Sequence, residues 1–312
     1  MREIVVFGGS AHPALSEEIC DHLGVQLYPV RLSRFANDCL EVQLQANCRE
    51  RDVFVIQPLG PPVQENLVEL LLMLDAARGA SAARVTAVIP YYSYARSDKK
   101  SMPRVSIGGR LVADLLVTAG ASRVLAMTLH SPQVHGFFSI PVDHLNALRE
   151  FADHFARLDL SNAVVVSPDL GNAKNAAALA RLLQLPVAAG AKERFSDERV
   201  MISSIIGDVE GRDVIVLDDE IARGTTIIEL LDRLRERDAR SVRIACTHGL
   251  FSDGALKRIA AQPLVQEIVT TNTLPTAEAG PDLQVISIAA ALAEAIRRIH
   301  EGESVSALFG AS

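Results

Sequence analysis

Residues 214–227 read Val-Ile-Val-Leu-Asp-Asp-Glu-Ile-Ala-Arg-Gly-Thr-Thr-Ile: an apolar run, then acids, then a turn of small residues that leads into a helix-like segment. Such a run followed by a turn and a helix is typical of a parallel strand in an α/β protein. The N–H groups at a helix start, helped by threonine hydroxyls, suit a phosphate monoester. The adjacent carboxylates of Asp218 and Asp219 could bind neighbouring sugar hydroxyls, or Mg²⁺ through water. The segment therefore predicts a cradle for ribose 5-phosphate, and an acidic strand end that stabilises a helix dipole is the alternative.

Outside this segment, short β-branched runs alternate with amphipathic helical segments along the whole chain. The expected strands lie near residues 4–7, 53–56, 84–89, 124–128, 164–167, 213–217, 242–247 and 265–270. The expected helices lie near residues 63–78, 107–118, 145–157, 172–183, 226–237 and 289–300. This alternation predicts parallel sheets covered by helices.

The helix-to-strand junctions repeat one pattern, which indicates two similar halves. We place the division near residue 145, so that one domain covers residues 1–145 and the other residues 146–312, each of ordinary domain size. The sequence leaves open to which domain the last helix returns. No linker rich in Pro, Gly or Ser separates the halves, so we expect a substantial interface and ligands at the carboxyl ends of the strands.

Composition narrows the class of protein. The chain has 312 residues, 49% of them hydrophobic, and 31 basic against 38 acidic residues give a net charge of −7. This balance excludes a disordered chain, and together with the absence of Trp it argues against a nucleic-acid partner. No apolar run is long enough to span a membrane, and the N-terminus lacks a signal-peptide pattern. Four cysteines without CxxC spacing favour small buried thiols in a reducing cytoplasm over zinc or disulfides.

The loop around Asp218 and Asp219 resembles the phosphoribosyl-diphosphate (PRPP) loop of type I phosphoribosyltransferases and of ribose-phosphate diphosphokinases, the PRPP synthetases. Other segments favour the second group because they look like its motifs and follow in the same order. These are Pro-Tyr-Tyr-Ser-Tyr-Ala-Arg-Ser-Asp-Lys-Lys at 90–100, Leu-His-Ser-Pro-Gln-Val-His-Gly-Phe-Phe at 129–138, Val-Ser-Pro-Asp at 166–169, Lys-Glu-Arg at 192–194 and Thr-His-Gly at 247–249. The resemblance implies two type I phosphoribosyltransferase-like domains, each a mainly parallel sheet flanked by helices, the first binding ATP and the second ribose 5-phosphate.

The resemblance also implies a reaction. The β,γ-diphosphoryl group of ATP would pass to the C1 hydroxyl of ribose 5-phosphate with the help of Mg²⁺, giving PRPP and AMP. The family's adenine-recognition segment usually comes from a neighbouring subunit, so a homo-oligomer built from dimers is implied, with a hexamer as the larger alternative.

The ATP site is expected around residues 96–110, where five cations stand in an otherwise acidic protein. A local positive field suits a triphosphate, and a solvated basic loop is the alternative. The resemblance assigns Arg96, Ser97 and His130 to ATP. It assigns Phe35 and Asn37 to stacking on adenine and reading its edge; taken alone, Phe35 would be a core aromatic.

The remaining assignments concern metal and catalysis. The resemblance implies that His130 and Asp169 contact Mg²⁺. It makes Lys192 and Arg194 the catalytic cations, because the polar stretch 192–199 is similar to the family's flexible catalytic loop. An exposed charged hairpin is the alternative for that stretch.

The phosphate loop departs from the family pattern Asp-Thr-x-Gly-Thr. Gly224, Thr225 and Thr226 are expected to hold the 5-phosphate, but Ala222 and Arg223 replace the acid and the first threonine. Losing one charged hydrogen bond costs about 1.5–3 kcal/mol, unless Arg223 contacts the phosphate instead. Further departures are Cys39, Ser97, Thr128 and Asn172. Two rivals follow: a catalytically weak regulatory homologue of a PRPP synthetase, and a phosphoribosyltransferase that consumes PRPP.

Overall fold

The computed structural model describes residues 3–194, 200–276 and 283–308. The chain forms two compact units. The first comprises residues up to Asn146, Thr273–Pro275 and the chain from Ser287, and the second comprises Ala147–Asn272 and Thr276–Ile286. Helix α8, whose placement the sequence leaves open, therefore lies in the first unit.

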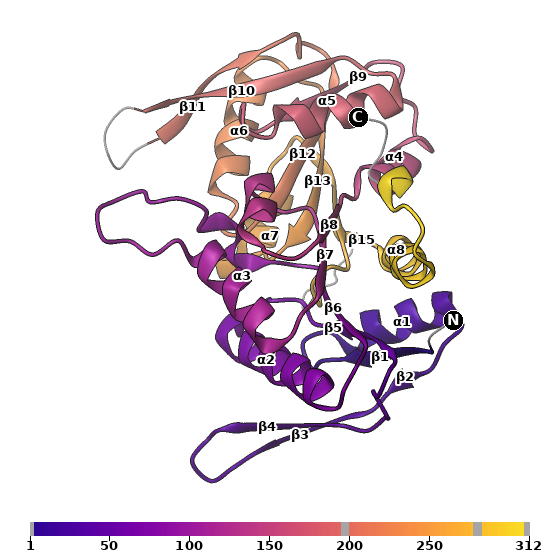
Figure 1. Ribbon diagram of the computed structural model, residues 1–312. Coiled ribbons are helices and arrows are strands. Elements are labelled where there is room, and N and C mark those ends of the chain that lie inside the picture. The colour runs from indigo at the N-terminus through magenta and orange to yellow at the C-terminus, as the bar shows by residue number, and fades with distance from the viewer. Residues whose placement is uncertain (1–2, 195–199, 277–282, 309–312) are drawn as a thin grey trace. The chain divides into compact units, whose positions relative to one another are not determined.

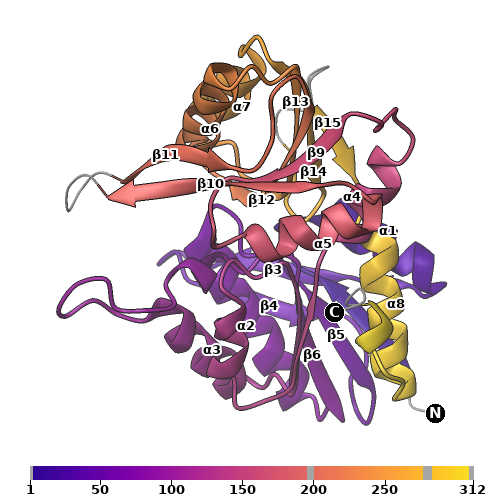
Figure 2. The same cartoon turned by 90° about the horizontal axis from the view of Figure 1, so that it is seen from above.

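The first unit contains a six-stranded parallel sheet in the order β2-β1-β5-β6-β7-β8 (Figure 1). Its strands are β1 (Ile4–Gly8), β2 (Leu27–Tyr28), β5 (Asp52–Ile56), β6 (Arg84–Ile89), β7 (Arg123–Met127) and β8 (Val142–Leu145). Its helices are α1 (Pro13–Leu23), α2 (Val63–Gly79), α3 (Gly108–Ala119) and α8 (Ala289–Glu301), with 3₁₀ turns η1 (Ser93–Arg96), η2 (Pro132–Phe137) and η4 (Ser306–Leu308). Helix α2 packs on α3 and helix α1 on α8, so both faces of the sheet are covered (Figure 2).

An antiparallel hairpin of β3 (Val30–Arg34) and β4 (Leu40–Leu44) stands apart from that sheet. Its residues are at most partly buried, and β4 packs on α2. The sequence analysis missed the hairpin because its alternating polar residues resemble a surface loop.

The sequence analysis missed helix α1 and the short helix Ala255–Ala260, and it began the helix near residue 145 too early. Helix α1 was not predicted; Pro13 begins it, the His12 ring accepts a hydrogen bond from the Leu15 N–H (3.3 Å), and Gly24 ends it at a φ of 66°. The helix expected from residue 145 begins only at Leu148, because the residues before it pair with β7 as strand β8.

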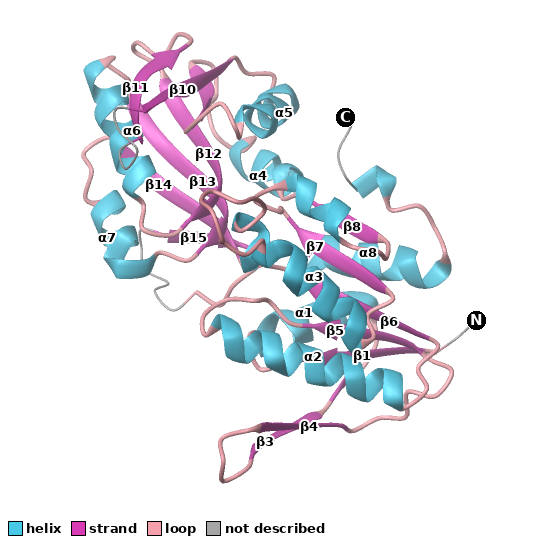
Figure 3. Cartoon of the chain, turned by 60° about the vertical axis from the view of Figure 1, so that its left-hand side comes forward, coloured by secondary structure: helices cyan, strands magenta, loops and turns pink. Residues whose placement is uncertain are grey.

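The second unit contains a seven-stranded sheet in the order β11-β10-β9-β12-β13-β14-β15, in which only β11 is antiparallel to its neighbour (Figure 3). The strands are β9 (Ala163–Ser167), β10 (Val187–Arg194), β11 (Val200–Ile206), β12 (Asp213–Ile221), β13 (Ser241–Gly249), β14 (Val265–Thr271) and β15 (Leu283–Ile286). The helices are α4 (Leu148–Phe155), α5 (Ala173–Leu183), α6 (Thr225–Glu236) and α7 (Ala255–Ala260), with the 3₁₀ turn η3 (Ser252–Gly254). Helix α4 packs on α5 and α6 on α7, and β9 is buried along its whole length.

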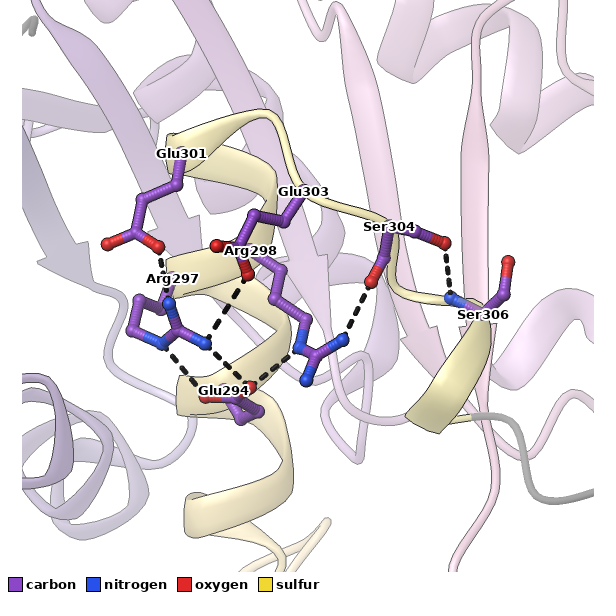
Figure 4. A network of polar contacts seen from close by, with 7 residues as sticks. All are labelled: Glu294, Arg297, Arg298, Glu301, Glu303, Ser304 and Ser306. Carbon is purple, nitrogen blue, oxygen red and sulfur yellow. Dashed lines mark hydrogen bonds and ion pairs between the residues drawn. The ribbon is translucent and has the colours of Figure 1, made fainter.

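A network of charged side chains lies at the C-terminal end of helix α8 (Figure 4). The Glu294 carboxylate accepts hydrogen bonds from Arg297 Nη2 (2.8 Å) and Arg298 Nε (2.6 Å), and these bonds lower the pKa of Glu294 to about 2. Arg298 Nη1 also donates to the Ser304 carbonyl (2.9 Å), which fixes the chain after the helix. In the part of the chain that the structure describes, no helix is long and apolar enough to cross a membrane.

Candidate functional site

In the first unit, the segments that carry Arg96 and His130 lie at the carboxyl ends of two neighbouring strands of the sheet. Arg96 ends η1 after β6, and His130 follows β7, the next strand in the sheet. Ser131 Oγ donates a hydrogen bond to Asp98 Oδ2 (2.6 Å) and so connects the two loops. The structure therefore brings these two predicted ATP segments together.

The backbone before His130 is held from β8. Thr128 has a φ of 40°, which is unfavourable for a β-branched residue and is kept only where the surroundings fix it. Its N–H donates to the Leu145 carbonyl (2.8 Å), and the Leu129 N–H donates to Nε2 of His144 (2.7 Å). His144 was missed by the sequence analysis, because nothing in a lone histidine near a strand end reveals that it accepts a bond from a distant loop.

We expect His144→Leu to lower the melting temperature by a few degrees and to raise the KM for ATP several-fold. Leu129 is 5% exposed, so its N–H would lose a buried acceptor at a cost of about 1–3 kcal/mol. Thermal unfolding and steady-state kinetics check this. His144→Gln, which can offer an acceptor oxygen, serves as the control; equal behaviour of the two variants would contradict a role for the acceptor.

The Ser97 hydroxyl takes part in the turn before α3. Ser97 Oγ accepts a hydrogen bond from the Gly108 N–H (2.9 Å), and the Ser97 carbonyl accepts one from the Gly109 N–H (2.9 Å). The residue therefore helps to position the start of α3, and its contact with ATP stays a prediction.

Phe35 lies on the turn of the β3–β4 hairpin, and it is 54% exposed. The alternative that Phe35 is a core aromatic is therefore wrong. The turn is ordered by the Phe35 N–H, which donates to the Cys39 carbonyl (2.9 Å), and by the Cys39 N–H, which donates to Asn37 Oδ1 (3.3 Å). The expectation of small buried thiols fails for Cys39, which is exposed; the other three cysteines are buried, and all four are free.

In the second unit, three carboxylates gather after the end of β9 and in the C-terminal half of β12. Asn172 Nδ2 donates to the Leu217 carbonyl (2.9 Å) and so attaches the loop after β9 to the middle of β12. In that loop Asp169 Oδ1 accepts the Asn172 N–H (3.1 Å), and next to it Asp218 Oδ1 accepts the Asp219 N–H (2.9 Å). Burial raises the pKa of Asp218 well above its ordinary 3.8, and the charges of Asp219 and Asp169 raise it further. The structure thus brings together the predicted metal and ribose ligands of this unit.

These carboxylates fit Mg²⁺. The mutual repulsion that raises the pKa of Asp218 would be relieved by a cation with a preference for oxygen ligands. Among the residues described, no group of three or more His, Cys, Asp or Glu side chains is placed to hold a metal. Mg²⁺ is typically held by one or two carboxylates together with substrate phosphates and water, so this arrangement suits it.

The phosphate loop leads into helix α6. Gly224 precedes the helix with a φ of 72°, and a Cβ on it would lie 2.8 Å from Cδ1 of Ile259, so both the backbone conformation and the close approach favour glycine. Thr225 and Thr226 form the first turn of α6, where the N–H groups have no acceptor within the helix. Arg223 Nε lies 3.2 Å from Oδ2 of Asp253.

Lys192 and Arg194 lie on strand β10 and pair with the antiparallel strand β11, so the stretch that was expected to be similar to a flexible catalytic loop begins as a strand. Their side chains and residues 195–199 lie outside the described part of the chain. Their catalytic roles stay predictions.

Comparison with known proteins identifies the family. The chain is 72% identical over its whole length to a protein of Streptomyces coelicolor named putative ribose-phosphate pyrophosphokinase, of which it covers 99%. This chain belongs to the ribose-phosphate pyrophosphokinase family. A relative from Deinococcus radiodurans with that family name is 49% identical, with 98% of each chain covered. Family models described as the N-terminal domain of ribose phosphate pyrophosphokinase and as the phosphoribosyl synthetase-associated domain match residues 4–120 and 197–310.

A solved structure agrees with this family assignment. The phosphoribosylpyrophosphate synthetase of Mycobacterium smegmatis is 39% identical and has a TM-score of 0.90, with 96% of this chain and 100% of that chain covered. The predicted family and the predicted fold class are both confirmed.

Proposed function

We propose that this chain is an active, Mg²⁺-dependent ribose-phosphate pyrophosphokinase, which transfers the β,γ-diphosphoryl group of ATP to the C1 hydroxyl of ribose 5-phosphate. The observation that carries the proposal is that Asp169, after β9, lies near Asp218 and Asp219 in the C-terminal half of β12, which continues into the loop before α6. Carboxylates for sugar hydroxyls and a helix start for a phosphate are what a ribose 5-phosphate requires.

In the second unit, Asp218 and Asp219 bind the ribose hydroxyls, and Arg223 with Gly224, Thr225 and Thr226 binds the 5-phosphate. Asp169 binds Mg²⁺. Bound Mg²⁺ would neutralise charge on the phosphates. Burial and the neighbouring carboxylates raise the pKa of Asp218, and bound Mg²⁺ would favour its ionised form.

In the first unit, Arg96, Ser97 and His130 bind the phosphates of ATP, and His130 also contributes to Mg²⁺ binding.

Lys192 and Arg194 stabilise the charge that moves between oxygens in the transition state. Phe35 and Asn37 bind the adenine of a neighbouring subunit. The exposed position of Phe35 supports this, because an unpacked aromatic at a hairpin turn is available to another chain. The functional enzyme is then a homo-oligomer, and the free cysteines favour a cytoplasmic location.

The products test the proposal. Purified protein with ATP, Mg²⁺ and ribose 5-phosphate is expected to release AMP and form PRPP in equal amounts, measured by chromatography. Formation of ADP would show transfer of a single phosphoryl group and exclude this reaction. Consumption of PRPP with a nucleobase would favour a phosphoribosyltransferase.

The replacement of the family's acid and threonine by Ala222 and Arg223 favours one second candidate, a catalytically weak regulatory subunit. The double variant Ala222→Asp, Arg223→Thr distinguishes the two. A large gain in turnover would indicate that this chain has lost activity, whereas a loss would indicate an adapted, active loop.

A further inference from the structure

The phosphate loop is joined to a second loop that the family motif does not include. This second loop, residues 250–254, follows β13 and precedes α7. Arg258 of α7 donates from Nη2 to the Arg223 carbonyl (2.7 Å) and from Nη1 to the Asp253 carbonyl, so one guanidinium holds the backbones of both loops. In the described part of the chain, the Arg223 side chain contacts Asp253, with Nε 3.2 Å from Oδ2.

The second loop has an unusual backbone that fixes where Asp253 lies. Phe251, Asp253 and Gly254 have φ values of 46°, 56° and 70°, a left-handed conformation that non-glycine residues adopt rarely. The N–H groups of Leu250 and Phe251 both donate to the Ile221 carbonyl (3.0 and 3.1 Å), which attaches the loop to the end of β12. A strained loop held from two sides places the Asp253 carboxylate beside Arg223.

The Arg223–Asp253 ion pair itself is weakly held. The two side chains are 77% and 69% exposed, and such exposed pairs contribute little to stability. A guanidinium that meets a phosphate dianion in a bidentate, charge-assisted contact makes a stronger interaction. Arg223 can therefore leave Asp253 when a phosphate arrives next to it at the start of α6.

We propose that Asp253 holds Arg223 in the enzyme without sugar phosphate, and that Arg223 exchanges Asp253 for the 5-phosphate of the substrate. Asp253 then determines how much of the protein has Arg223 available, and so sets the affinity for the sugar phosphate. The exchange explains how a loop without the family's acid and first threonine keeps a phosphate contact. The inference depends on the proposed function, since it takes the start of α6 as the 5-phosphate site.

The test measures the Kd of ribose 5-phosphate by calorimetry, with Mg²⁺ and a non-hydrolysable ATP analogue present, so that it does not depend on turnover. Asp253→Asn is expected to tighten binding about 2–6-fold, because it removes the competing carboxylate. Asparagine tolerates the left-handed backbone, so the loop should keep its shape. The matched control is Asp232→Asn on α6, whose exposed carboxylate pairs with Arg235 at 2.8 Å and which should leave the Kd unchanged.

Arg223→Ala is expected to weaken binding about tenfold and to remove the effect of Asp253→Asn in the double variant. An unchanged or weaker affinity of Asp253→Asn would overturn the inference, as would the same gain in the absence of Arg223. Thr226→Val separates the two proposals. If Thr226→Val weakens binding while Asp253→Asn has no effect, the proposed exchange is wrong but the phosphate site stands. If both Thr226→Val and Arg223→Ala leave the Kd unchanged, the 5-phosphate site is wrong, and the inference is wrong with it.

Discussion

Asp218→Asn should reduce kcat/KM at least a hundredfold and at the same time raise the melting temperature. The variant loses a charged acceptor for a ribose hydroxyl and weakens the site for Mg²⁺, which together account for the loss of activity. It also removes a carboxylate that burial and the charges of Asp219 and Asp169 disfavour. We expect a gain of about 1 kcal/mol, or about 2–4 °C, as is common when a functional residue is made neutral. Kinetics and calorimetric unfolding measure the two effects.

The gain in stability should depend on pH. Folding raises the pKa of this carboxyl group. Between its ordinary pKa of 3.8 and the raised pKa, the group is ionised in the unfolded chain but protonated in the folded protein. The free energy of unfolding therefore falls as the pH rises through this range. Asparagine does not titrate. The difference in melting temperature between Asp218→Asn and the original protein should therefore be smallest near about pH 4 and widen toward neutral pH. A constant difference would argue against a raised pKa.

The central strands and most helices follow from the sequence because burial on both faces leaves a simple pattern. Strand β9 is a continuous apolar run that nothing but a buried parallel strand explains, and β5 is similar. The β3–β4 hairpin and β10–β11 could not be predicted in the same way, because polar residues such as those at 192–194 form a strand here through main-chain pairing with the next strand, which leaves no apolar pattern. Helix α1 was missed since few of its residues form an apolar stripe, and its capping by His12 is an uncommon signal.

Some residues of the candidate site could likewise be predicted from the sequence, and others could not. Two adjacent acids after an apolar run can be recognised in the sequence itself, so Asp218 and Asp219 were correctly predicted as candidate site residues. The contacts that hold the loops were not, because they join residues far apart in the chain: His144 to Leu129, and Arg258 to Arg223. The left-handed φ of Thr128 and of Phe251 is also beyond sequence reasoning, since neither residue type favours it.

Gly224→Ala should weaken binding of ribose 5-phosphate about 10–100-fold and destabilise the protein by about 2–5 kcal/mol. A left-handed backbone costs alanine about 1–2 kcal/mol, and overpacking adds about 1–3 kcal/mol. The new Cβ would lie 2.8 Å from Ile259 Cδ1 and 3.3 Å from the Cβ of Ala255, so either the buried Ile259 side chain or the backbone before α6 must shift. That backbone presents the N–H groups to the phosphate, which is why binding should suffer together with stability. Denaturant unfolding and calorimetric titration of ribose 5-phosphate measure both effects.

A matched control separates backbone strain from the steric clash. Gly211 has a φ of 66°, and a Cβ on it would meet nothing within 4 Å, so Gly211→Ala should cost only the strain and leave substrate binding intact. Ile259→Val removes the atom that the new methyl group meets. The double variant Gly224→Ala, Ile259→Val should therefore be less destabilised than the sum of the single variants by about 1 kcal/mol. Strict additivity would mean that the clash does not limit this position, and that the left-handed conformation alone makes glycine necessary in the phosphate loop.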